Sequence, residues 1–151
     1  MEAVIGLGQM SIGEEKNKRS LEKLRPHKKR VLIVDDDKDF ANLLKYKLEK
    51  LEPNVTCVTI SDPYEAVISL TDENYEKIYI DQNMPGLNGD AVIREADRFI
   101  DYDSTAQMMK SPSHKTPVVF MSGRDLDQNR PNFSFFEIRE KINKREFALM
   151  N

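Results

Sequence analysis

The stretch Ile78–Gly89, with the sequence IYIDQNMPGLNG, is the part of the chain that decides the fold. Its first three residues form an apolar run of the kind found in strands that are covered on both faces. Asp81 follows this run directly, and the Pro- and Gly-containing segment Met84–Gly89 predicts a loop. A helix is expected from about Asp90. The pattern therefore predicts a buried strand that ends in an acid, then a loop, then a helix.

Similar apolar runs recur on both sides of this stretch, separated by amphipathic segments. Further strands are predicted over residues 31–34, 55–60, 117–121 and 133–138. Helices are predicted over residues 40–51, 63–70, 90–100 (with an extension through 106–109) and 143–150. Strands that alternate with helices predict a doubly wound α/β domain with a five-stranded parallel sheet and helices on both faces.

Polar residues follow the predicted strands at one end. In open parallel sheets, ligands bind outside the carboxyl ends of the strands. The residues at or just past those ends are Asp35, Asp36, Asp81, Ser122 and Lys141. We therefore expect these side chains to meet at one edge of the sheet.

The residue types at this edge predict phosphoryl chemistry around a cation. Carboxylates that converge repel one another and need protons or a cation nearby, and their hard oxygen atoms suit Mg²⁺. With the cation bound, Asp81 is a candidate nucleophile towards phosphorus. Lys141 and Ser122 offer an ammonium and a hydroxyl to the charged phosphoryl oxygens.

The motifs resemble those of bacterial two-component response-regulator receiver domains, which are CheY-like. Val31–Asp37 is similar to their first strand and acidic pair, and Ile78–Gly89 to the phosphoacceptor strand and its loop. Thr116–Gly123 resembles the fourth strand, and Glu140–Phe147, less closely, the lysine segment. The resemblance covers about residues 30–150 and implies a flavodoxin-like sheet with strand order 2-1-3-4-5.

This resemblance implies a set of metal ligands. Asp36, Asp81 and the backbone carbonyl of Asn83 would bind Mg²⁺ directly, and Asp35 would act through a metal-bound water. Asp81 would receive its phosphoryl group from a sensor histidine kinase or a histidine phosphotransfer protein. The domain would catalyse its own phosphorylation and slow dephosphorylation, without turnover of an external substrate.

The resemblance also assigns the groups around the phosphoryl position. Ser122 and Lys141 would contact the phosphoryl group, and Asn83 and Arg124 are candidate modulators of its lifetime. Phosphorylation of Asp81 would alter the binding of a downstream protein, which the sequence does not name. Dimerisation is left open.

Four departures from the family pattern concern the switch. Ile142 follows Lys141 where the family has a proline in a cis peptide, so we expect a trans bond. Ile138 stands where an aromatic switch residue is usual. The segment between Ser122 and Lys141 is short, which predicts a stunted fourth helix. Residues 101–115 form an insertion.

Charge and composition give the domain organisation. Residues 1–29 are predicted as a basic extension, a mobile tail or a short helix, and residues 30–151 as the receiver domain. Formal net charge is −3, and no apolar run reaches the ~20 residues of a membrane span. Cys57 stands alone, so no internal disulfide is expected. A cytoplasmic protein without a nucleic-acid-binding domain is predicted.

Three readings of function remain at this point. The first is a phosphorylatable receiver, and the second is a receiver-like interaction module that works without phosphorylation. The third is a phosphatase with an aspartyl nucleophile. Such phosphatases usually carry a second acid two residues after the nucleophile, where this chain has Asn83.

Overall fold

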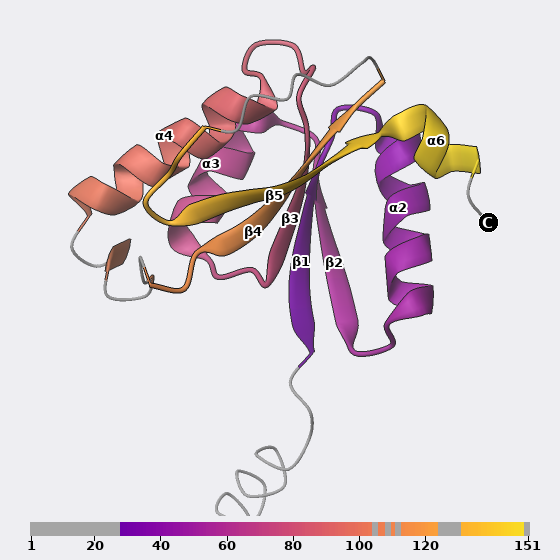
Figure 1. Cartoon of the computed structure of the whole chain (residues 1–151), viewed down its shortest axis with the longest axis horizontal. Helices are drawn as coiled ribbons and strands as arrows, with labels where there is room; N and C mark the ends of the chain where they lie inside the picture. The colour runs from indigo at the N-terminus through magenta and orange to yellow at the C-terminus, as the bar shows by residue number, and fades with distance from the viewer. Residues whose placement is uncertain (1–27, 104–105, 108–109, 111–112, 124–130, 150–151) are drawn as a thin grey trace, which may run out of the picture.

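A computed structural model describes residues 28–103, 106–107, 110, 113–123 and 131–149 of the chain. It contains one parallel five-stranded sheet with strand order β2-β1-β3-β4-β5, and helices cover both faces of this sheet (Figure 1). The predicted fold class and strand order are confirmed.

The bounds of the elements follow the apolar runs of the sequence. The strands are β1 (Lys29–Val34), β2 (Val55–Ile60), β3 (Lys77–Asp81), β4 (Thr116–Ser122) and β5 (Phe136–Asn143). The helices are α2 (Lys38–Leu51), α3 (Pro63–Asp72), α4 (Gly89–Tyr102) and α6 (Lys144–Leu149).

The core has two layers, one on each face of the sheet. Helices α3 and α4 lie on one face, and α2 and α6 lie on the other (Figure 1). Strand residues alternate between these layers: Leu32, Ile78 and Phe120 pack in the α3/α4 layer. Ile33 and Tyr79 pack with Leu44 of helix α2 in the other layer. Because both faces of the sheet are buried at its centre, the runs 31–34, 78–80 and 118–121 of β1, β3 and β4 are continuously apolar.

Polar side chains fix where three helices begin. Asp37, Asp62 and Asn88 are the N-cap residues of α2, α3 and α4, and each side chain accepts a hydrogen bond from a backbone N–H in the first turn. Pro63 stands at the start of α3, as the sequence predicted. Helices α2 and α3 begin four and three residues after the preceding strand, and α4 begins eight residues after β3.

Gly89, the first residue of α4, lies against the carboxyl end of β3. A Cβ atom at this position would lie 2.5 Å from the carbonyl oxygen of Asp81. Only glycine allows the helix to start so close to the strand end. The loop between them is consequently held tightly against the edge of the sheet.

The predicted bounds of β5 are wrong. Residues 133–138 were expected in this strand, but β5 begins at Phe136 and continues to Asn143. Phe133 and Phe135 are buried in the segment before the strand, where Asp97 of α4 accepts hydrogen bonds from the backbone N–H groups of Ser134 and Phe135 (3.1 and 2.8 Å). The buried aromatic residues Phe133 and Phe135 therefore give the sequence pattern of a strand, although the segment that carries them lies before β5 and packs against helix α4.

Several expectations fall partly outside the described residues. Helix α4 ends at Tyr102, where the N–H of Asp103 donates to the carbonyl oxygen of Phe99. Residues 106–107 of the expected extension are helical, and residues 104–105 and 108–109 lie outside the described part of the chain. The described part of the chain does not include residues 1–27 of the basic extension, or residues 124–130, which contain Arg124 and part of the expected fourth helix. Among the described helices, none has the length and apolar character needed to cross a membrane.

Candidate functional site

Three carboxylates lie together at the carboxyl ends of β1 and β3. Asp35 and Asp36 follow β1 directly, and Asp81 is the last residue of β3. One oxygen from each carboxylate lies within 4.8 Å of the others. Asp35 and Asp81 are buried (1% and 3% exposed), whereas Asp36 is exposed. The predicted meeting of these three acids is therefore observed.

Backbone N–H groups hold one oxygen of each buried carboxylate. Oδ1 of Asp35 accepts from the N–H of Asp37 at 2.9 Å, and Oδ1 of Asp81 accepts from the N–H of Asn83 at 3.0 Å. The Oδ2 atoms of both acids contact a lysine ammonium instead. This lysine is Lys144, whose Nζ lies 2.6 Å from Asp35 and 3.2 Å from Asp81.

The lysine at the site is thus Lys144, at the position where the sequence analysis expected Lys141. Lys141 lies inside β5, where it pairs with Phe120 in register. Its neighbour Ile142 packs in the layer of α2, which is also the layer of Tyr79. Because neighbouring strand residues point to opposite faces, Lys141 belongs to the α3/α4 face, away from the face to which α6 brings Lys144.

A bulge in β5 explains why Lys144, and not Lys141, contacts the acids. Val118 pairs with Ile138 but Val119 pairs with Glu140, which leaves Arg139 as the additional residue. The strand therefore continues past Lys141 and ends only at Asn143. The apolar Ile142, two residues before Lys144, is the signal from which this longer strand could have been predicted.

Burial and like charge control the protonation of the acids. The pKa of Asp81 is raised to about 6, and burial is the largest cause. The hydrogen bond from the N–H of Asn83 lowers this pKa, the Asp35 carboxylate raises it further, and Lys144 lowers it. Burial alone would lower the pKa of the Lys144 ammonium, but contacts with Asp35 and Asp81 outweigh burial and raise it. The lysine consequently remains charged at neutral pH.

Ser122 ends β4 beside the acids. Its side chain is buried (3% exposed), and its Oγ accepts a hydrogen bond of 2.8 Å from Nδ2 of Asn83. Asn83 therefore contacts two site residues, through its backbone N–H and through its side-chain amide. Strand β4 pairs with β3 up to Asp81 and Met121, which places Ser122 one residue beyond the acid.

Comparison with known families agrees with this arrangement. The family model described as response regulator receiver domain matches residues 31–146. The chain belongs to this family. The match includes all the site residues named above, from Asp35 to Lys144.

Relatives and solved structures give the same fold. The chain is 29% identical over 101 residues to the transcriptional regulatory protein CpxR of Escherichia coli (strain K12), covering 67% of this chain and 36% of that protein. The Mg²⁺-complexed receiver domain of the histidine kinase CKI1 of Arabidopsis thaliana superimposes with a TM-score of 0.58 at 20% identity, over 82% of this chain and 88% of that one. The receiver domain of the sensor histidine kinase PA1611 of Pseudomonas aeruginosa PAO1, with a magnesium ion coordinated in its active-site cleft, gives 0.54 at 18% identity, over 80% and 91%.

The residues around Lys144 also depart from the family pattern. The residue after Lys144 is Arg145, where the receiver family usually has proline, and the residue three positions earlier is Lys141, where an aromatic switch residue is usual. None of the described peptide bonds is cis, as expected for the Lys141–Ile142 bond. Both departures noted for Lys141 therefore also hold for Lys144.

The acids of this receiver domain fit a divalent cation. Their donors are all oxygen atoms, which Mg²⁺ prefers. Oδ2 of Asp35 is buried, and the contact that the structure gives it is the ion pair of 2.6 Å with Lys144. Three clustered carboxylates beside the Lys144 ammonium leave negative charge that a cation would offset.

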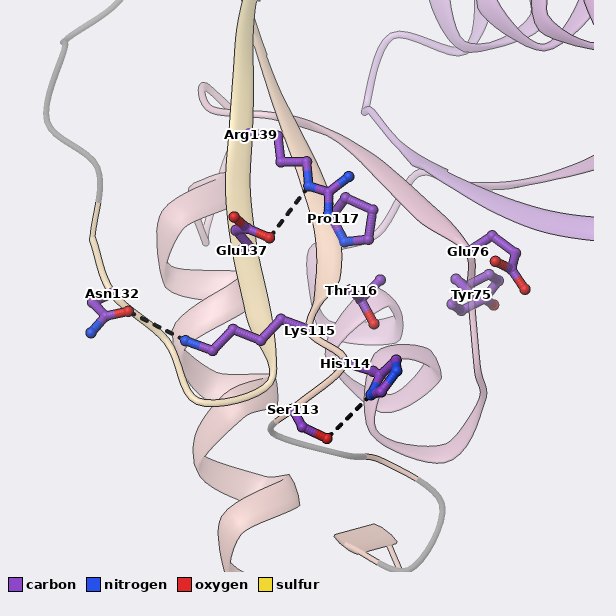
Figure 2. A pocket seen from close by; sticks show the side chains of 10 residues that line it. All are labelled: Tyr75, Glu76, Ser113, His114, Lys115, Thr116, Pro117, Asn132, Glu137 and Arg139. Atoms are coloured by element: carbon purple, nitrogen blue, oxygen red, sulfur yellow. Dashed lines mark hydrogen bonds and ion pairs between the residues drawn. The ribbon is translucent and has the colours of Figure 1, made fainter.

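A cavity of about 740 Å³ lies elsewhere, at the amino ends of β4 and β5 (Figure 2). Among the residues that line it, Arg139 forms an ion pair with Glu137 at 3.3 Å, and Lys115 donates a hydrogen bond to the side-chain oxygen of Asn132 at 3.5 Å. His114 accompanies Ser113 on the loop before β4. The cavity is therefore separate from the acidic site, which lies at the carboxyl ends of the strands.

Proposed function

We propose that this receiver domain accepts a phosphoryl group on Asp81 in a Mg²⁺-dependent reaction, and that phosphorylation changes its binding to a partner protein. The observation that carries the proposal is the contact of the Lys144 ammonium with two buried acids, Asp35 and Asp81, at the carboxyl ends of the strands. The chain spans about a third of the length of the curated relatives it matches, so the function proposed is that of this domain.

Asp36, Asp81 and the backbone carbonyl of Asn83 would hold the Mg²⁺, with Asp35 acting through a water. The bound ion supplies charge neutralisation between the acids and the phosphoryl oxygens. The family and the clustered carboxylates support this ligand set.

Side chains of the domain would carry out the transfer and bind the transferred phosphoryl group. A carboxylate oxygen of Asp81 forms a bond to phosphorus while the bond from phosphorus to the donor breaks, and the donor leaves with the electron pair. For a phosphohistidine donor, on a histidine kinase or a phosphotransfer protein, the leaving imidazole takes up a proton. Lys144 and the hydroxyl of Ser122 would then donate hydrogen bonds to phosphoryl oxygens.

A phosphorylation assay tests the proposal and separates the two lysines. Purified protein is incubated with phosphoramidate and Mg²⁺, and its intact mass is followed with time. We expect the mass gain of one phosphoryl group in the wild type and none in Asp81→Asn. Lys144→Ala should slow the reaction roughly 10- to 100-fold, because it removes a donor to the charged phosphoryl group, while Lys141→Ala should change it less than about twofold.

Two outcomes would contradict the proposal. If the wild type gains no Asp81-dependent mass at saturating Mg²⁺, the domain is a receiver-like interaction module that works without phosphorylation. If Lys141→Ala abolishes the reaction while Lys144→Ala leaves it intact, the assignment of the lysine from the structure is wrong. Turnover of small phosphomonoesters would instead favour the phosphatase reading.

A further inference from the structure

The Lys144 ammonium lies over an aromatic ring as well as beside the acids. Its Nζ lies 4.9 Å from the centre of the Phe40 ring, in addition to its contacts with Asp35 and Asp81. The lysine side chain is 16% exposed and Phe40 is 9% exposed. The ammonium is thus largely removed from water, a setting in which the negative face of a ring attracts a cation more strongly.

The backbone fixes this ring beside the acids. Phe40 lies in the first turn of α2, and its N–H donates to the N-cap side chain of Asp37 at 3.1 Å. The same turn follows directly after Asp35 and Asp36. The position of the ring is consequently set by the segment that carries two of the three acids.

A second ring ties α6, which carries the lysine, to the same place. Phe147 lies three residues after Lys144 on α6, so both side chains lie on one face of that helix. Its ring packs edge-on against Phe40, with 6.2 Å between centres and 64° between planes. Lys47 of α2 donates to the carbonyl oxygen of Phe147 at 3.2 Å, and its Nζ lies 5.0 Å from the Phe147 ring.

We propose that Phe40 is a positioning residue for phosphoryl transfer: its ring holds the Lys144 ammonium between Asp35 and Asp81. A lysine side chain has several rotatable bonds, and fixing it costs conformational entropy. Here α6 is only six residues long, and the contacts of the Phe40 ring with Lys144 and Phe147 limit that freedom. This inference rests on the proposed function for its kinetic consequence, but the placement of the ammonium is measurable without phosphorylation.

Proton NMR tests the placement directly. A ring at 4.9 Å shifts the ε-methylene protons of Lys144 upfield, so we expect this shift in the wild type and in Phe40→Tyr, and its loss in Phe40→Leu. Phe133→Leu is the control, because Phe133 has similar exposure (6%) and packs in the other core layer. An unchanged Lys144 shift in a folded Phe40→Leu protein would overturn the proposal whether or not the domain is phosphorylated.

A double-mutant cycle tests the kinetic consequence with phosphoramidate and Mg²⁺. Phe40→Leu should slow phosphorylation roughly three- to tenfold, as expected for loss of a desolvated cation–π contact, and Phe40→Tyr less than about twofold. In a Lys144→Met background, Phe40→Leu should have little further effect, because its target is gone. Equal slowing in both backgrounds would show that Phe40 acts by some other route.

Two further readouts keep the outcomes distinct. Pentafluorophenylalanine in place of Phe40 keeps the ring shape but reverses the electrostatics of its face, so it should slow phosphorylation even if Phe40→Leu does not fold; a wild-type rate would contradict the proposal. A wild type that gains no Asp81-dependent mass rejects the proposed function, while the NMR shift still decides the placement of the lysine.

Discussion

Asp81 is a carboxyl group held where its negative charge is unfavourable. It is 3% exposed, and burial raises its pKa from 3.8 to about 6, with the neighbouring Asp35 carboxylate adding to the effect. The native state therefore binds a proton more tightly at Asp81 than the unfolded state does. Stability from this group is fully present below pH 3.8 and is lost as the pH rises through about 6.

Asp81→Asn is accordingly expected to stabilise the domain at neutral pH. In the absence of divalent ions, the free energy of unfolding at about pH 7.5 should rise by about 1–3 kcal/mol, and the gain should shrink as the pH falls below the folded-state pKa. Urea denaturation at several pH values measures this. Asp101→Asn, an exposed acid on α4, is the matched control. A loss of stability at pH 7.5 would contradict the expectation.

Gly89 is a second residue whose identity the site requires. In Gly89→Ala the new methyl group would meet the backbone oxygen of Asp81 at 2.5 Å, and a backbone atom cannot move aside as a flexible side chain can. We expect a loss of about 1–3 kcal/mol in the free energy of unfolding. Gly123→Ala is the control, because its Cβ would meet nothing within 4 Å. Equal stability of the two variants would be inconsistent with the close approach.

Single residues also show how far the sequence predicts the site. The three acids and Ser122 were placed correctly because each follows a short apolar strand, and parallel strands end at one edge. The lysine was misplaced by three residues, because the predicted strand ended at Ile138 whereas β5, with its bulge at Arg139, continues past Lys141. The contact of Phe40 with Lys144 joins segments far apart in the chain, so no local pattern predicts it.

At the scale of elements, the segment before β5 depends on helix α4. Asp97 accepts two backbone hydrogen bonds, from Ser134 and Phe135, and thereby holds Phe133 and Phe135 in the core. The strand bounds predicted from the sequence failed here because burial of these aromatics comes from tertiary packing. Most other elements were predicted to within a few residues, since their apolar runs and N-cap residues are local signals.

Asp97→Ala tests this connection between elements. This substitution removes the carboxylate that accepts hydrogen bonds from the N–H groups of Ser134 and Phe135. We therefore expect the free energy of unfolding to fall by about 1–3 kcal/mol. Hydrogen exchange of the Ser134 and Phe135 amides should accelerate more than that of β1 amides. Asp101→Ala, on the exposed side of the same helix, should change neither measurement. Unchanged exchange at Ser134 and Phe135 would show that the segment is held by its apolar contacts alone.

For the whole molecule, cation binding should appear as added stability. A ligand that binds only the native state raises its stability in proportion to the logarithm of its concentration above Kd. We expect Mg²⁺ at several millimolar to raise Tm at about pH 7.5 by a few degrees, and much less at about pH 5, where protonated Asp81 is a poorer ligand. The rise should be absent in Asp36→Asn, whose exposed side chain makes this variant a mild change to the fold. A similar rise in Asp36→Asn would indicate binding elsewhere.

The distance between the amino and carboxyl ends of the parallel strands has a practical consequence for fluorescence work. Strand β4 has seven residues, so the loop that carries Ser113 lies roughly 20 Å from the acids. Cys57, the one natural thiol, is buried, and burial raises its pKa to about 11, which makes it a poor target for maleimide dyes. A thiol introduced by Ser113→Cys would therefore take up a dye selectively, and that dye could report on partner binding while leaving the acidic edge untouched.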